Sequence, residues 1–311
     1  MREPQEIAFL SSDGKTTVKA SIWTPEEKET RGVVQICHGM VEHIRRYDEF
    51  AQELCARGFA VCGDDHLGHG RTAGSAENFG YFGEKDGWKR LVEDEDRMRR
   101  EMQARFPALP YFLLGHSMGS FITRNYITRY ADGLSGYICC GTSGPNPLNG
   151  FGILLSKLMV RFQGGRRRGD FLNKVAFKEY NSRYGEVKTG HEWLSRDPDS
   201  YAGVDDDPAT SFVFTNAGFR DLFQLLYSVT GKKWSEKIPK DLPIIFLSGD
   251  MDPVGQFGKG VRKVYELVKA SGVKDVSLKL YPGARHELHH ETNKDEFLAD
   301  VVNWIEQHMP A

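Results

Sequence analysis

Short apolar runs alternate with helical segments along most of this chain, and this alternation constrains the fold more than any other feature. Apolar runs of this length are typical of buried strands in a parallel sheet. They span residues 33–37, 59–62, 111–114, 137–140, 244–247 and 276–280. Segments with helical spacing include residues 47–57, 88–106, 117–130, 258–270 and 297–308. Strands that alternate with helices predict a doubly wound α/β sheet.

A hairpin precedes this pattern. Residues 7–10 and 17–23 have the composition of two strands, with a turn around Asp13-Gly14 between them and Pro25 ending the second strand. Together with the six later runs, these strands predict an eight-stranded, mostly parallel sheet that is flanked by helices.

The alternation stops between about residues 143 and 219, where the sequence becomes mixed polar and aromatic. A chain of 311 residues is long enough for one α/β core and an insertion. We therefore predict a core of residues 1–142 and 220–311 with an inserted helical cap at 143–219. Such a cap lies above the carboxyl ends of the strands, where ligands bind in open α/β sheets.

Charge and composition exclude several classes of protein. The chain has 41 basic and 43 acidic side chains, and a net charge of −2 gives no large field to attract a polyanion, so we expect no nucleic-acid partner. We find neither a signal peptide nor an apolar run of about 18 residues, which predicts a cytoplasmic protein. The five cysteines, most of them within apolar runs, are interpreted as reduced core residues.

The pentapeptide Gly-His-Ser-Met-Gly at 115–119 has the pattern G-x-S-x-G and lies between a predicted strand and a predicted helix. A serine hydroxyl is a poor nucleophile unless a base takes its proton, so it must project where an imidazole can reach it. A sharp strand-to-helix turn achieves this, and the two glycines allow close approach of the backbone. The sequence therefore predicts Ser117 as a nucleophile, and an ordinary glycine-rich turn is the alternative.

A nucleophilic serine in this setting predicts an acid after one late strand. The run 244–247 leads into Asp250 and Asp252. Asp252 is our choice for the carboxylate that holds the imidazole tautomer, because Asp252 lies deeper in the loop, and Asp250 is the alternative.

A histidine is then expected after the next strand, and the run 276–280 leads into His286. His289 and His290 compete with it as the general base. His286 is the first histidine after a Pro-Gly turn and belongs to the loop at the strand end, whereas the other two begin the next helix. We therefore predict His286 as the base.

Residues 286–290 also match H-E-x-x-H, in which two histidines one helical turn apart bind zinc. That site requires a helix across all five residues, yet Pro282 and Gly283 form a turn just before it. No pattern supports Glu306 or Asp300 as the third ligand. We therefore predict no metal and no cofactor.

Acyl transfer builds negative charge on a carbonyl oxygen, which backbone N–H groups stabilise by about 3 kcal/mol each. One predicted donor is Met118, the residue after the nucleophile. The second comes from the loop after the strand 33–37, where Met40 is our choice. The alternative is that His38-Gly39 only ends the strand.

With these residues in place, the chain resembles the monoglyceride lipase and lysophospholipase group of α/β-hydrolases, bacterial serine hydrolases with a helical cap. The likeness covers nearly the whole chain. It rests on five segments, at residues 38–43, 64–70, 115–119, 249–252 and 282–287. The resemblance implies an α/β-hydrolase fold, a Ser-His-Asp triad with an acyl-enzyme intermediate, and a small-molecule carboxylic ester as substrate.

Two details qualify this resemblance. The group often has glycine where Val41 stands, so the local backbone of the oxyanion loop and the choice of Met40 depend on how valine fits there. The Trp-Leu-Ser-Arg-Asp string at 193–197 looks like one that recurs in caps of the group. This string supports a cap without naming its ligand.

The predicted cap begins with a dense apolar stretch at 151–162, just before an arginine-rich turn. A helix of this kind fits an acyl tunnel or transient contact with a lipid surface, and packing onto the core is the alternative. The same alternatives apply to the phenylalanines near the end of the cap. As substrate-binding residues we name Leu155, Met159, Phe162, Phe212 and Phe214.

The favoured substrate is an ester with one small polar end and one acyl chain, such as a monoacylglycerol. A serine aminopeptidase or amidase on the same fold is the first alternative, because it uses the same triad with an acidic pocket for the amino terminus. The acidic residues available for that pocket are Glu192, Asp197, Asp199, Asp205, Asp206 and Asp207. A non-catalytic ligand-binding protein is the second alternative, but such a protein normally lacks a triad member.

Overall fold

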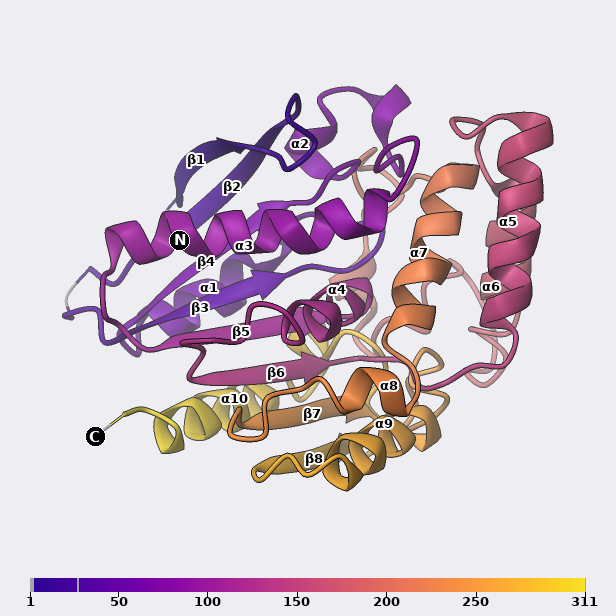
Figure 1. Ribbon diagram of the computed structural model, residues 1–311. Coiled ribbons are helices and arrows are strands. Elements are labelled where there is room, and N and C mark those ends of the chain that lie inside the picture. Colours follow the sequence, from indigo (N-terminus) through magenta and orange to yellow (C-terminus); the bar gives the residue numbers. More distant parts are fainter. Residues whose placement is uncertain (1–2, 27, 311) are drawn as a thin grey trace.

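The computed structural model describes residues 3–26 and 28–310. Its centre is one eight-stranded sheet with the strand order β1-β2-β4-β3-β5-β6-β7-β8 (Figure 1). The strands are β1 (Gln5–Leu10), β2 (Thr17–Trp23), β3 (Gly32–Cys37), β4 (Phe59–Asp65), β5 (Tyr111–His116), β6 (Gly136–Cys140), β7 (Ile244–Gly249) and β8 (Val276–Tyr281). β1 pairs antiparallel with β2, and β2 pairs antiparallel with β4. Every other neighbouring pair is parallel, which confirms the predicted sheet.

Helices cover both faces of the sheet. Successive side chains of a strand point to opposite faces, so an apolar run presents apolar side chains on both faces, and the helices bury them. On β5, Leu113 packs with the helices α3, α4 and α9, whereas Leu114 packs with α1 and α10. These helices are α1 (Asp48–Cys55), α3 (Gly87–Arg105), α4 (Met118–Tyr126), α9 (Lys259–Ala270) and α10 (Lys294–Gln307). The strands β3 to β7, which are buried along their whole length, are therefore enclosed by two apolar layers, as their apolar runs predict.

The connections hold several short helical turns. These are η1 (Ile44–Tyr47), α2 (Gly70–Ala73), η2 (Ala76–Asn78), η3 (Pro198–Tyr201), α8 (Lys232–Ser235) and η4 (Leu288–His290). Two of them flank the strand ends that concern function, because η1 follows the loop after β3 and η4 follows the loop after β8.

A helical insertion separates β6 from β7. It contains α5 (Asn149–Gln163), α6 (Asp170–Phe177) and α7 (Asn216–Ser228). Figure 1 shows these helices beyond the ends to which β5 and β6 point, and α5 packs along α7. The predicted boundary at 219–220 falls inside α7, and the division into a core of 1–142 and 220–311 and a cap of 143–219 stays a prediction.

The cysteines are free thiols, and four of the five are buried. Among the described helices, none has both the length and the apolar character needed to cross a lipid bilayer.

Candidate active site

Ser117 occupies a sharp turn between β5, which ends at His116, and α4, which begins at Met118. Its backbone has φ 53° and ψ −121°, a conformation that a residue with a side chain rarely adopts. The turn brings the backbone close to the end of β3. A Cβ added to Gly119 would collide with the carbonyl oxygen of Cys37. Only glycine fits at 119, as predicted from the need for close approach, and the serine side chain remains partly exposed.

His286 and Asp252 form a buried pair at the ends of β8 and β7. The His286 Nδ1 atom lies 3.0 Å from Asp252 Oδ1, and the two residues are 2 % and 0 % exposed. The Asp252 carboxylate also accepts a hydrogen bond from the backbone N–H of Val254 at 2.8 Å. The alternative acid, Asp250, instead accepts from the backbone N–H of Gly283 at 2.7 Å, so it holds the turn before His286.

Ser117 and His286 meet at the carboxyl end of β6. The backbone N–H of Ser117 donates to the carbonyl of Cys140, the last residue of β6. Gly141 follows Cys140 and lies beside His286, since a Cβ added to Gly141 would be 3.2 Å from the imidazole Cε1. Among the hydrogen bonds of the described residues, none joins the Ser117 hydroxyl to this imidazole. The structure therefore gathers the three predicted triad residues at one edge of the sheet and leaves the proton relay between them as a proposal.

The loop after β3 passes beside Ser117, the predicted nucleophile, since a Cβ on Gly39 would lie 3.1 Å from the Cβ of Ser117. Val41 in this loop has φ 57°, a left-handed conformation that is costly for a β-branched residue. A residue there with no Cβ would be unstrained, which explains why glycine suits the position. Of the two predicted oxyanion donors, Met40 lies in this loop and Met118 is the first residue of α4, where N–H groups have no partner within the helix.

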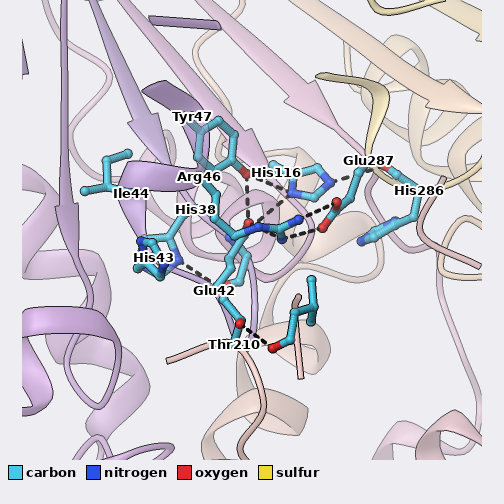
Figure 2. A network of polar contacts seen from close by, with 12 residues as sticks. His38, Glu42, His43, Ile44, Arg46, Tyr47, His116, Thr210, His286 and Glu287 are labelled. Carbon is cyan, nitrogen blue, oxygen red and sulfur yellow. Dashed lines mark hydrogen bonds and ion pairs between the residues drawn. The ribbon is translucent and has the colours of Figure 1, made fainter. Parts of the chain in front are cut away.

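A buried carboxylate, that of Glu42, holds this loop. It accepts a hydrogen bond from the backbone N–H of Gly39 and another from the Tyr47 hydroxyl at 3.1 Å, and it lies 3.4 Å from His116 Nδ1. Figure 2 shows these side chains converging. Burial alone would raise the pKa of Glu42, but the hydrogen bond and charge of His116, together with the charge of Arg46, hold that pKa well below its usual value.

The same network reaches the loop of the predicted base. Arg46 contacts Glu42 at 3.4 Å and donates to both carboxylate oxygens of Glu287 at 2.7 and 2.8 Å. His116 Nε2 lies 3.3 Å from the carbonyl oxygen of His286 (Figure 2). Buried polar side chains therefore connect the loop after β3, the turn of Ser117 and the loop of His286. Sequence reasoning missed this network, although all of its members lie within or beside the motifs that it singled out.

The H-E-x-x-H pattern does not have the geometry of a zinc site. Residues 286 and 287 lie in a loop, and η4 covers only Leu288–His290, so no helix runs across the pattern. His286 is paired with Asp252, and Glu287 is paired with Arg46.

One group of metal-ligating side chains does gather within the described residues, outside the H-E-x-x-H pattern. Cys37, His66 and Glu95 bring a ligand atom each within 4.8 Å of one another, and all three are buried. His66 Nδ1 is already 3.3 Å from both Asp64 and Glu95. Burial, and then the charge of Glu95, raises the pKa of the Cys37 thiol well above its usual value.

The structure does not bring the five predicted substrate-binding residues together in one site. Leu155 and Met159 line a cavity of about 470 Å³ between α5 and α6. Phe162 is 78 % exposed, whereas Phe214 is fully buried in the core cluster. Phe212 packs at 6.0 Å from the ring of Phe214, between centroids.

Comparisons with known proteins agree with this geometry. The sequence model of the family described as serine aminopeptidase, S33, matches residues 28–293. A monoacylglycerol lipase of Mycolicibacterium smegmatis is 28% identical over 95% of both chains, and the human monoglyceride lipase is 27% identical over 98% of this chain and 94% of its own length. Among solved structures, a thermostable carboxyl esterase from Bacillus coagulans in complex with glycerol has a TM-score of 0.92 and 37% identity over 99% of both chains.

Proposed function

Because the chain belongs to the serine aminopeptidase S33 family, and within it to the monoglyceride lipase-like α/β-hydrolases, we propose that it hydrolyses monoacylglycerols and similar esters through Ser117, His286 and Asp252. It is a carboxylic ester hydrolase, like its relatives. The observation that supports the triad most directly is the buried 3.0 Å contact between His286 Nδ1 and Asp252 beside the strained turn of Ser117.

Each residue has one role in the proposed reaction. Asp252 holds the His286 tautomer whose Nε2 is free to accept a proton, and His286 takes the hydroxyl proton of Ser117 as the oxygen attacks the ester carbonyl. The N–H groups of Met40 and Met118 stabilise the oxyanion. His286 then protonates the leaving alcohol, and water hydrolyses the acyl-enzyme by the same steps in reverse order.

The exposed face of α5 and α6 supports the second part of the proposal, transient contact with a lipid surface. Large apolar side chains gather there without cover from the described residues, and a patch of this kind marks a site of interaction. They are Leu148, Phe151, Leu154, Leu158, Phe162, Phe171 and Val175, each at least 45 % exposed.

The acidic residues of the insertion give little support to the aminopeptidase alternative. A free carboxylate near the nucleophile is required to hold an amino terminus, but Glu192 accepts hydrogen bonds from three successive backbone N–H groups at 188–190. Asp197 accepts from the N–H of Asp199, and Asp205 and Asp207 pair with histidines. Four of the six acidic residues named for such a pocket are therefore already engaged, which favours esters as substrates.

The test compares three variants on a monoacylglycerol and on a ladder of p-nitrophenyl esters. Ser117→Ala is expected to lower kcat by a factor on the order of 10⁶, and Asp252→Asn by about 10⁴. Asp250→Asn is the matched control, because the Asp250 carboxylate accepts from the backbone N–H of Gly283 and does not contact the imidazole. Its kcat should stay within about tenfold of the wild-type value. If Ser117→Ala keeps more than a tenth of the wild-type rate, Ser117 is not the nucleophile. Turnover of peptides without any ester activity contradicts the substrate class.

A further inference from the structure

The indole of Trp193 lies over the imidazole of His286. Their ring centroids are 5.0 Å apart and the ring planes are inclined by 35°. A second ring from the core, that of His116, contacts the same imidazole at 4.8 Å. Trp193 is partly exposed whereas His286 is 2 % exposed, so the indole covers the imidazole on the side of the insertion.

The segment that carries this indole is fastened to the loop of His286. The backbone N–H of Glu287 donates to the carbonyl of Leu194 at 2.8 Å, and the Arg285 guanidinium donates to the carbonyl of Ser195 at 2.9 Å. The hydroxyl of Ser195 in turn donates to the carbonyl of His290 at 2.9 Å. These contacts run in both directions between the two short segments, and together they hold the indole beside the imidazole.

Two further aromatic rings hold the indole from the side of the insertion. Tyr180 contacts Trp193 edge to face at 5.0 Å, and Phe177 lies at 6.3 Å. Phe177 and Tyr180 also contact each other at 4.8 Å. An aromatic ring packed on several sides has one preferred orientation, so Trp193 forms a fixed wall rather than an adaptable one.

This wall lies beside the leaving group of the proposed reaction. Asp252 occupies Nδ1 of His286, so Nε2 is the atom that delivers a proton to the departing alcohol. A proton donor must come within about 3 Å of the oxygen that it protonates, which places the alcohol against His286 and the acyl chain away from it. The ring that packs on His286 therefore borders the space beside the imidazole that the alcohol enters.

We propose that Trp193 is a specificity-determining residue that limits the alcohol part of the ester to a small group, of the size of glycerol. This inference rests on the proposed function, because it requires His286 to be the base. In this arrangement Trp193 borders the alcohol part of the ester, and the acyl chain lies on the side away from His286.

The test keeps the acyl chain constant and varies the alcohol. Octanoyl esters of glycerol and of a bulky alcohol such as 2-naphthol are compared in wild type, Trp193→Ala, Trp193→Phe and Tyr227→Ala. In Trp193→Ala the ratio of kcat/KM for the bulky ester to that for the glycerol ester should rise at least about tenfold, which is the usual discrimination of one pocket wall. Trp193→Phe should give an intermediate ratio. Tyr227→Ala removes an exposed aromatic side chain of α7 and should leave the ratio unchanged.

Three outcomes separate this inference from the proposed function. An equal loss of rate on both esters, with the ratio unchanged, means that Trp193 only supports the imidazole and overturns the inference. If Trp193→Ala does not fold, the ratio in Trp193→Phe decides alone, and a ratio equal to the wild type overturns the inference as well. Full activity of Ser117→Ala contradicts the proposed function itself, whatever the ratio is.

Discussion

The buried ion pair between Arg46 and Glu287 should stabilise the protein strongly only while both partners are present. The side chains are 13 % and 4 % exposed, and two charge-assisted hydrogen bonds of 2.7 and 2.8 Å join them. Removing one partner of such a pair costs about 3–5 kcal/mol, because the other charge stays buried without compensation. Glu42, at 3.4 Å from Arg46, compensates part of that charge, so we expect about 3 kcal/mol for Glu287→Leu.

Arg46→Met should be the more damaging change, at about 5 kcal/mol, because it leaves two carboxylates buried side by side. The double variant Arg46→Met/Glu287→Leu is the matched control, since it replaces the pair by apolar groups of similar size. It should recover at least about 2 kcal/mol relative to Arg46→Met. Urea unfolding followed by tryptophan fluorescence measures these free energies. Single variants that each cost less than about 1 kcal/mol, or a double variant no more stable than Arg46→Met, refute the reasoning.

The pH dependence of the same variants gives an independent check. Burial alone would raise the pKa of Glu287, but the charge and hydrogen bonds of Arg46 bring that pKa below the usual 4.5. A carboxyl whose pKa is lower in the folded state stabilises the protein above its unfolded pKa, and this contribution is lost as the pH falls through the folded pKa. The difference in unfolding free energy between wild type and Glu287→Leu should therefore shrink below about pH 4.5. A difference that stays constant down to pH 3 contradicts the assigned ionisation.

Two further predictions concern the nucleophile turn and the rejected metal site. In Gly119→Ala the new Cβ would collide with the carbonyl oxygens of Cys37 and His38, so this variant should lose at least about 3 kcal/mol of stability and all esterase activity. Gly150 lies in open space on α5, so Gly150→Ala should raise the stability by about 0.5–1 kcal/mol. Thermal unfolding measures both changes in stability. Excess EDTA should leave the esterase rate unchanged, because His286 and Glu287 are committed to Asp252 and Arg46, and a loss of rate that Zn²⁺ restores contradicts this assignment.

The apolar pattern predicted the sheet because burial on both faces leaves a strong local signal. Each of the six runs falls inside one of the strands β3 to β8. The pattern failed at the strand ends, where polar residues are buried with partners from elsewhere in the chain. β4 extends beyond the predicted end at Cys62 to Asp65, whose carboxylate accepts hydrogen bonds from the backbone N–H groups of Ile44 and Arg71. Ile44 lies 21 residues before Asp65, so a short window of sequence around β4 does not contain this partner.

The candidate site, like the sheet, was predicted only in part from the sequence. Short motifs indicated Ser117, Asp252 and His286, since the order of nucleophile, acid and base follows the order of the strands. The pairing within the network beneath them left no such signal, because Arg46 and Glu287 are 241 residues apart. The available hint was that Glu42 and Glu287 lie inside motifs that were expected to be buried. A buried charge normally has a partner, so each of these carboxylates indicated a polar contact.

The network also explains how strained backbone persists at this site. Ser117 and Val41 both have φ above 50°, and both flank the close approach at Gly39. Such strain costs about 1–3 kcal/mol per residue and persists only where the surroundings fix the conformation. Apolar packing does not specify the direction of a backbone amide, because the hydrophobic effect is non-directional. The Glu42 carboxylate does specify it, since it binds the N–H of Gly39 while Tyr47, His116 and Arg46 hold the carboxylate itself. A charge at this place, rather than a leucine of the same volume, is therefore what the geometry of the predicted oxyanion loop requires.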